Sequence, residues 1–411
     1  MAEYFVARKP ILDRNKSIFG YEVLFRGTGN GDVLHHPGDG PMRAALVDPG
    51  LAAFIGNKTG FLKFNPEVAW DEAREQIPPG KAVIEVADTP SLGSDVLGAY
   101  QSLKERGYRL CLEASGLDVF SPLVQMVGFV KLDVRTDRDN LEEMVQHLKK
   151  LPVTLIGAGV DGKEAFDLCH GLGFSLFQGE FFARPAMIGK KSVSPSQALL
   201  MELSALVARN DDLEKIESVF RRNPDLTLGL LKLMNSAFFR VPQKVTSIRH
   251  AIALLGYDNL QKWVAVLLFS IDRQDPSTNP LLEKVLLRGR IMELLAAKGS
   301  HGAVEPDSAF MTGILSLVHV LFGLPLREVI EKLNVIPEIQ GALLRREGFL
   351  GTLLDVTERL DDDDLGEAGQ LVSGLGLKLD DLFAAETSAI LEYQKWMADA
   401  YNMPGEKPGH G

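Results

Sequence analysis

Two kinds of hydrophobic pattern follow each other along this chain. In the first half, short apolar runs alternate with longer stretches of helical spacing, such as 90–106 and 140–151. The short runs lie at 18–25, 60–65, 82–86, 109–113, 129–133, 153–157 and 174–178. Short apolar strands separated by helices are typical of parallel β–α units. Seven such units before residue 187 favour a closed barrel over an open sheet.

The pattern changes near Pro185. Strand-like runs end there, and helical periodicity continues to the C-terminus. The helices are expected at 198–208, 213–220, 226–234, 247–255, 260–269, 280–297, 309–321, 326–333, 337–345 and 388–401. We therefore predict an α/β plus all-α protein: a TIM-like βα barrel at 1–187, a small, polar linker at 188–196, an all-helical domain at 197–402 and a flexible tail at 403–411.

Composition and charge narrow the class of protein. The chain has 411 residues, too many for one ordinary core, and is 45% hydrophobic and 24% charged, as globular proteins are. It has two cysteines, no signal peptide and no apolar run long enough to span a bilayer, so we expect a cytoplasmic protein without a membrane partner. The net charge of −11 and the lack of basic stripes argue against direct nucleic-acid binding.

Polar side chains stand at the ends of the predicted strands. In a β–α barrel the chemistry lies where the strands end, because the loops there converge on one mouth. The polar residues at those ends are Glu22, Asn65, Glu85, Glu113, Lys131, Asp133 and Gln178. Each one alone is more often a satisfied rim group. As a set, the oxygen ligands suit a hard divalent cation, and a lysine beside them could orient a water or a phosphate.

Several short motifs occur in a fixed order along the first half. They are ARKPILD at 7–13, GYEVLFR at 20–26, FNP at 64–66, IEV at 84–86, VKLD at 130–133 and FQG at 177–179. Together they resemble the EAL domain, the family of cyclic-di-GMP phosphodiesterases, over residues 1–187. The resemblance implies that Glu22, Asn65 and Glu85 are metal ligands and that Lys131 is catalytic. It also implies that Arg26 faces the nucleotide phosphate and that Gln178 lies at the mouth.

Two loops depart from the pattern of active EAL members. Those members carry two adjacent aspartates where this chain has Glu113-Ala114, and a glutamate where it has Ala158. Glu113 keeps a carboxylate, but the alanines remove side-chain oxygens that two adjacent metal ions need. We therefore expect a vestigial metal site and no cofactor, with Mg²⁺ or Mn²⁺ only if residual phosphodiesterase activity exists. The barrel is expected to bind either a nucleotide or a protein partner. The candidate nucleotide is cyclic-di-GMP, which would be bound through Arg26, Lys131 and Gln178.

A second interpretation of the first half stays open. The run Gly157–Gly162, GAGVDG, matches G-x-G-x-x-G, follows an apolar strand and precedes a helical stretch. That is the form of the NAD- or FAD-binding fingerprint. Its place near the end of a strand series, with an all-helical region after it, disfavours a dinucleotide-binding domain.

The helical half carries motifs of its own: RNPDL at 222–226, LMNSAF at 233–238, SIRHAIALLG at 247–256 and MTGILS at 311–316. They resemble the HDOD domain, a relative of the HD phosphohydrolases, over roughly 197–400. No His-Asp dipeptide occurs in the chain, and His319 on an apolar helix is expected to be a core or boundary residue. We therefore expect a non-enzymatic module that binds an unidentified signalling protein. A weakly active phosphodiesterase is the alternative for the chain as a whole.

Overall fold

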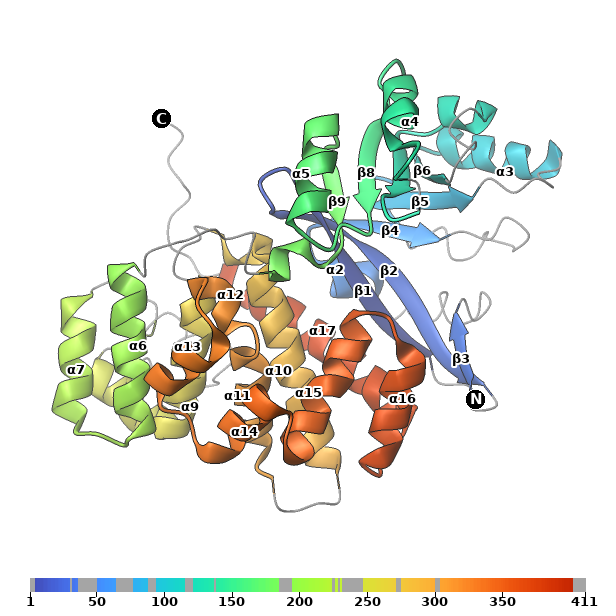
Figure 1. The fold of residues 1–411 in the computed structure, drawn as a ribbon. Helices are drawn as coiled ribbons and strands as arrows, with labels where there is room; N and C mark the ends of the chain where they lie inside the picture. Colours follow the sequence, from blue (N-terminus) through green and yellow to red (C-terminus); the bar gives the residue numbers. More distant parts are fainter. Residues whose placement is uncertain are drawn as a thin grey trace. The chain divides into compact units, whose positions relative to one another are not determined.

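The computed structural model describes residues 4–29, 32–35, 50–63, 77–87, 94–114, 121–136, 138–184, 194–223, 226–227, 230, 247–270, 275–299 and 304–401 of the chain (Figure 1). The chain divides into two compact units. One comprises residues 1–187 with 278–280, and the other comprises 188–277 with 281–411.

The first unit is a closed β–α barrel. Its strands are β1 Tyr4–Asp13, β2 Ile18–Gly29, β3 Asp32–His35, β4 Thr59–Lys63, β5 Ala82–Ala87, β6 Arg109–Ala114, β7 Phe129–Asp133, β8 Thr154–Ala158 and β9 Leu176–Gln178. Strands β2 and β4 to β9 are parallel in sequence order, and antiparallel β1 closes the ring by pairing with both β2 and β9. Strand β3 pairs only with β2, outside the ring. The predicted barrel is confirmed.

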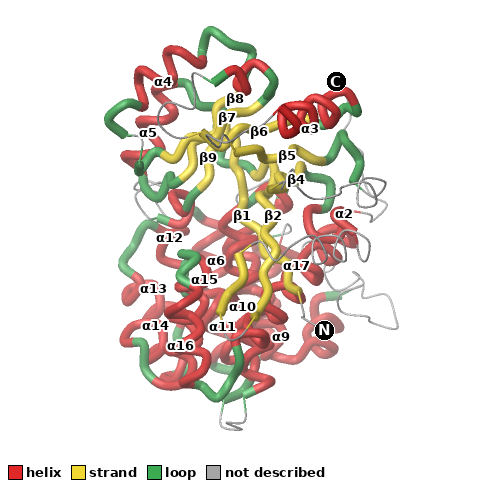
Figure 2. Tube along the Cα trace, turned by 90° about the vertical axis from the view of Figure 1, so that its right-hand side faces the viewer, coloured by secondary structure: helices red, strands yellow, loops and turns green. Residues whose placement is uncertain are grey.

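Helices cover the outside of the barrel strands. Helices α3 Ser94–Glu105, α4 Leu141–Leu148 and α5 Lys163–Leu172 lie around the strands in Figure 2, and α2 Leu51–Ile55 precedes β4. Helix α4 buries Leu141, Met144, Val145 and Leu148, the spacing of one helix face. Helix α5 ends at Gly173, whose φ of 91° closes the last turn in a left-handed conformation that glycine adopts without strain.

The second unit is entirely helical in its described residues. Its helices are α6 Pro195–Ala208, α7 Leu213–Arg222, α9 Ile248–Ser270, α10 Pro280–Lys298, α11 Pro306–Leu315, α12 Val318–Phe322, α13 Leu326–Leu333, α14 Pro337–Arg345, α15 Gly348–Asp361, α16 Leu365–Gly374 and α17 Leu379–Tyr401. A capping box starts α6: Ser194 Oγ accepts from the Gln197 amide, and Gln197 Oε1 accepts from the Ser194 amide. This helix therefore begins inside the segment predicted as linker.

The helical half differs from its predicted boundaries at several points. The predicted break between the helices 247–255 and 260–269 is confirmed: α9 spans both, but it is kinked at Gly256, where the backbone is non-helical (φ 72°). The predicted helix 309–321 is two helices, α11 and α12. Helices α15 and α16 were not predicted, and α17 starts nine residues before the predicted 388. Most of the predicted helix 226–234, the linker residues before 194 and the tail 403–411 lie outside the described residues.

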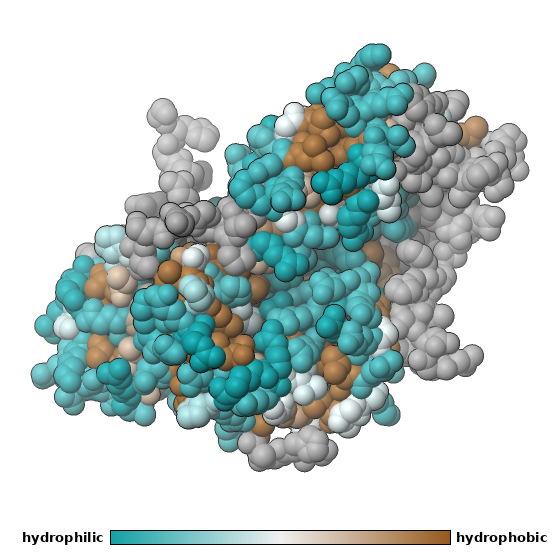
Figure 3. Space-filling model, in the orientation of Figure 1, coloured by the Kyte–Doolittle hydropathy of each residue, from teal (hydrophilic) through white to brown (hydrophobic). Residues whose placement is uncertain are grey.

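Surface and helix composition add two observations. On the face drawn in Figure 3, hydrophilic residues predominate and hydrophobic residues form small separate patches.

Within the described ranges, no single helix has the length and apolar character needed to cross a membrane. The helices at 306–322 and 326–333 meet that test only as a pair, and they are bent by 118°.

His319 on α12 gives the helical unit a pH-dependent stability. Burial lowers its pKa below the ordinary 6.5, and the nearby Arg288 and Arg346 lower it further, against a backbone hydrogen bond at Ser316. The unfolded chain therefore takes up this proton at a higher pH than the folded chain. Its contribution to stability is complete above about pH 6.5 and is lost as the pH falls below that value.

We therefore expect His319→Asn to flatten the decline in the free energy of unfolding between pH 7 and pH 5. Urea unfolding at the two pH values measures it. His250→Asn, on α9, should keep the parental decline. An equal decline in parent and His319→Asn would show that His319 does not carry the effect.

Candidate functional site: the polar layer of the barrel

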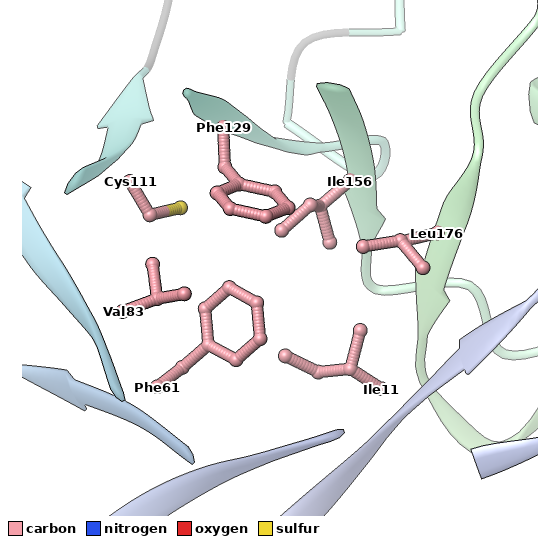
Figure 4. Close-up of a cluster of buried hydrophobic side chains, with 7 residues drawn as sticks. All are labelled: Ile11, Phe61, Val83, Cys111, Phe129, Ile156 and Leu176. Atoms are coloured by element: carbon pink, nitrogen blue, oxygen red, sulfur yellow. The ribbon is translucent and has the colours of Figure 1, made fainter. Parts of the chain in front are cut away.

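The inside of the barrel is built in layers. Seven strands each send one apolar side chain to the same level, where the side chains converge in Figure 4: Ile11, Phe61, Val83, Cys111, Phe129, Ile156 and Leu176. All seven are at most 7% exposed, and the Phe61 and Phe129 rings meet edge to face at 5.6 Å. Because strand side chains alternate between two faces, the residue two positions further along each parallel strand also points inward. This second level is the polar layer.

The polar layer contains most of the residues that the sequence picked out. On the parallel strands that supply the apolar level, and on β2, its members are Glu22, Lys63, Glu85, Glu113, Lys131, Ala158 and Gln178. Five of them, Glu22, Glu85, Glu113, Lys131 and Gln178, were predicted site residues. The structure thus brings together side chains that are up to 156 positions apart in the sequence.

Lys131 is the centre of a buried group of four side chains. Its Nζ lies 2.5 Å from Glu85 Oε1 and 3.4 Å from Glu22 Oε2. Gln178 Nε2 donates a hydrogen bond of 2.7 Å to the same Glu22 oxygen. Lys131 and Glu85 are each 3% exposed, and Glu22 and Gln178 are each 7% exposed. Charges buried to this degree persist only when they are paired, so the four side chains form one interdependent unit.

Lys63 on β4 is a member of the layer that sequence reasoning missed. Its Nζ lies 3.2 Å from Glu113 Oε2 and 3.8 Å from Glu22 Oε1, and its side chain is 35% exposed. The lysine therefore links a buried carboxylate to Glu113, whose side chain is 47% exposed. Lys63 lies two positions after the inward-facing Phe61, so the alternation of strand side chains would have identified it. The prediction instead took Asn65, the polar residue at the end of the predicted strand.

Burial and charge act in opposite directions on the two buried carboxylates. Burial alone raises the pKa of Glu22, but Lys131, Lys63 and the Gln178 hydrogen bond outweigh it and lower the pKa to about 2. Burial also raises the pKa of Glu85, and the negative charge of Glu22 raises it further. Together they outweigh the positive charge of Lys131, so the pKa of Glu85 is about 7. Burial disfavours the charged form of Lys131, yet Glu85 and Glu22 raise its pKa overall. The ammonium group is thus held charged by its carboxylate partners.

One predicted site residue, Arg26, lies apart from this layer. Arg26 is buried on β2, four residues beyond Glu22, which places its Cα about 13 Å from that of Glu22 along an extended strand. Its backbone is in register with Phe5 and His35. Asn65 lies outside the described residues. The layer therefore holds the carboxylates, the amide and the lysines, while the predicted phosphate ligand Arg26 lies further along its strand.

The residues of the layer do not fit a two-metal centre. Mg²⁺ needs oxygen ligands at about 2.0–2.1 Å in near-octahedral geometry. Here the oxygens of Glu22, Glu85 and Glu113 face two ammonium groups, Lys63 and Lys131. Across the described part of the chain, no group of three or more His, Cys, Asp and Glu side chains could hold a metal ion. Ala158, at the layer position on β8, supplies no side-chain oxygen.

The glycine-rich loop after β8 is held by contacts within the barrel. The Val160 amide donates to the Gln178 carbonyl, and the Val160 carbonyl accepts from the Phe181 amide. Val160 is fully buried, and a side chain on Gly179 would meet the Val160 backbone at 2.3 Å. A closed barrel is also not the open sheet whose crevice binds dinucleotides. These contacts do not favour the NAD or FAD interpretation of 157–162.

One protein family matches a region of this chain, and two known proteins match most of its length. The HDOD domain family matches residues 195–329. A protein of Vibrio cholerae serotype O1 named cyclic di-GMP phosphodiesterase CdgJ is 28% identical over 409 residues, covering 96% of this chain and 92% of that protein. The uncharacterized protein YuxH of Bacillus subtilis strain 168 is 25% identical over 381 residues, covering 89% and 93%.

A solved structure also matches part of the chain. It is a standalone EAL protein from Vibrio cholerae O395 in its c-di-GMP-bound form, 18% identical, with a TM-score of 0.35. The match covers 44% of this chain and 92% of that protein.

Proposed function

We propose that this chain, an EAL-like barrel followed by an HDOD domain, is a cyclic-di-GMP signalling protein whose barrel binds its ligand without hydrolysing it. The HDOD domain then passes the state of the barrel to a protein partner. The relative CdgJ carries cyclic di-GMP in its name, which supports this choice of ligand.

The position of Lys63 carries the proposal that the barrel is not catalytic. Its ammonium group lies between Glu22 and Glu113, two carboxylates that the EAL resemblance assigns to the metal site. A tethered ammonium supplies positive charge at this place, but it cannot activate a water molecule as a bound metal ion does. Lys131, deeper in the layer, neutralises Glu85 in the same way. The carboxylates are therefore matched by charges that belong to the chain itself.

Lys63 is also the cation best placed to meet a phosphate. Lys63 and Lys131 each contact two carboxylates, but the Lys63 side chain is 35% exposed, whereas that of Lys131 is 3% exposed. A fixed positive charge binds phosphate oxygens without a metal ion. We therefore assign the first phosphate contact to Lys63. Lys131 and Gln178 act beneath it by holding Glu22 in place.

The test compares hydrolysis with binding. Purified full-length protein should not hydrolyse cyclic-di-GMP in Mg²⁺ or Mn²⁺ but should release or absorb heat when titrated with it. Lys63→Gln removes the exposed charge and should weaken binding at least tenfold, a loss of about 1.4 kcal/mol. Lys58→Gln, in the turn before β4, is the matched control and should bind as the parent does.

One further function is favoured by a specific observation. The relative CdgJ is named a phosphodiesterase, so weak hydrolysis is the second candidate. Metal-dependent turnover that Glu22→Ala abolishes would establish it and would overturn the binding-only proposal. Absence of both turnover and binding heat would show that cyclic-di-GMP is not the ligand.

The HDOD part of the proposal rests on the family match at 195–329 and on the absence of a His-Asp dipeptide from the sequence. HD hydrolases use that pair to bind their metal. We infer that this domain works through contacts with another signalling protein rather than through a reaction.

A further inference from the structure

The helical unit contains a cavity of about 280 Å³ between α9, α10, α11 and α17. Four aromatic side chains line it: Trp263 on α9, Phe310 on α11, and Tyr393 and Trp396 on α17. The space is partly open to solvent, and an open pocket of this size that is lined by aromatic rings has the character of a ligand site.

A chain of ion pairs runs beside the cavity and joins all four helices. Lys262 Nζ on α9 lies 2.5 Å from Asp307 on α11 and 3.2 Å from Glu293 on α10. Arg290, also on α10, contacts Glu293 at 2.8 Å and Glu392 on α17 at 2.7 Å. Four of these five residues line the cavity itself, with Asp307 at the end of the chain. The pocket therefore combines aromatic walls with a charged, hydrogen-bonding edge.

The charges decide what kind of molecule the pocket accepts. The chain of ion pairs contains three carboxylates and two cations, and each cation already contacts two carboxylates. An anionic ligand would therefore find no spare positive charge. A cationic ligand would compete with Lys262. The Nζ of that lysine lies 5.3 Å from the centre of the Phe310 ring and already makes the cation–π contact that the ring can offer. A neutral molecule avoids both penalties.

The rings decide the shape of that molecule. Trp263 stacks on Phe220 at 6.0 Å behind the cavity, and Tyr393 lies 6.3 Å from Trp396 along α17. Flat aromatic surfaces bind flat ligands such as nucleobases by stacking. The cavity is at the lower end of the usual 300–1,000 Å³ range of small-molecule pockets, which limits the ligand to about one ring system.

We propose that this pocket binds a neutral, planar heteroaromatic molecule of about nucleobase size. Its ring packs against Trp396 and Phe310, which are partly exposed, and its polar edge meets Arg290 and Glu392. Helix α17 lies beyond the HDOD match at 195–329, so the site depends on a helix outside the matched region. Binding would join this helix more tightly to α9 and α10.

Tryptophan fluorescence tests the proposal in the full-length chain. The protein has three tryptophans, and Trp70→Phe leaves only the two that line the pocket. In that background, adenosine or guanosine should quench the fluorescence saturably. AMP, which adds negative charge, and 1-methyladenosine, which adds positive charge, should bind at least tenfold more weakly than adenosine.

Two matched variants separate binding from folding. Val266 lines the cavity on α9, so Val266→Phe should fill it, abolish quenching and leave the melting temperature unchanged or higher. Leu254→Phe also enlarges a side chain on α9, at a position that is 48% exposed, and should bind as the parent does. The proposal is overturned if neither nucleoside quenches, if Val266→Phe responds as the parent does, or if either charged compound binds as tightly as adenosine.

Discussion

Replacing Lys131 with methionine should lower the free energy of unfolding of the barrel unit by about 3–5 kcal/mol, the usual cost of removing one partner from a buried ion pair. The methionine keeps most of the volume but removes the charge. Glu85 and Glu22, at 3% and 7% exposure, would then share a dry layer without the ammonium group that they contact at 2.5 and 3.4 Å. Lys131 lowers the pKa of Glu85, which is about 7 with the lysine in place, so without the lysine Glu85 takes up a proton at neutral pH and the ion pair is lost.

Urea unfolding of the full-length chain, followed by a probe of the β structure, measures the loss. Lys81→Met provides the control, because Lys81 is exposed and its Nζ donates only to the Asn57 carbonyl among the bonds described, so it should cost less than 1 kcal/mol. Adding Glu85→Gln to Lys131→Met should restore part of the stability, because a neutral amide replaces a buried carboxyl group that would have to take up a proton. A loss below 1 kcal/mol for Lys131→Met, or no recovery in the double variant, would mean that the buried group is not one electrostatic unit.

The barrel could be predicted from the sequence because its strands carry two signals at once. The apolar runs gave the strand positions, and the order of polar residues at their ends gave the site; β7 Phe129–Asp133 agrees with the prediction at both ends. Antiparallel β1 was identified only through the EAL resemblance. The helical half was harder, because period alone does not show where a helix bends. The kink at Gly256, where φ is 72°, lies where a break between two helices was expected, but the division of 309–321 into α11 and α12 was not predicted.

The sequence predicted most of the residues that form the site, but not how their charges pair. Glu22, Glu85, Glu113, Lys131 and Gln178 were expected near one another and lie in the polar layer. A list of strand ends does not record which face each residue occupies, and for that reason Lys63 was passed over. The sequence also could not show that Lys131 is buried against Glu85 while Lys63 stays partly exposed. That difference depends on how far each strand is shifted along its neighbours, because the register between strands sets how deeply each side chain lies in the barrel.

Replacing Lys63 with serine should create a binding site for Mn²⁺. Lys63 Nζ lies 3.2 Å from Glu113 and 3.8 Å from Glu22, so its removal leaves two carboxylates facing a space that an ammonium group had filled. Hard divalent cations take carboxylate oxygens readily, and a serine hydroxyl adds another neutral oxygen. The affinity for Mn²⁺ should rise at least tenfold over that of the parent chain.

Electron paramagnetic resonance of free Mn²⁺ in titrations of the full-length chain gives this affinity directly and does not depend on any reaction. Lys58→Ser serves as the matched control and should bind Mn²⁺ no better than the parent. Lys63→Ser/Glu113→Gln should lose the gain, since Glu113 carries the more exposed of the two carboxylates. If the parent chain binds Mn²⁺ as tightly as Lys63→Ser does, the ammonium group does not take the place of a metal ion. Hydrolysis should stay low even in Lys63→Ser with Mn²⁺ bound, because Ala158 still withholds a carboxylate on the opposite side of the mouth, and two adjacent metal charges require that additional ligand.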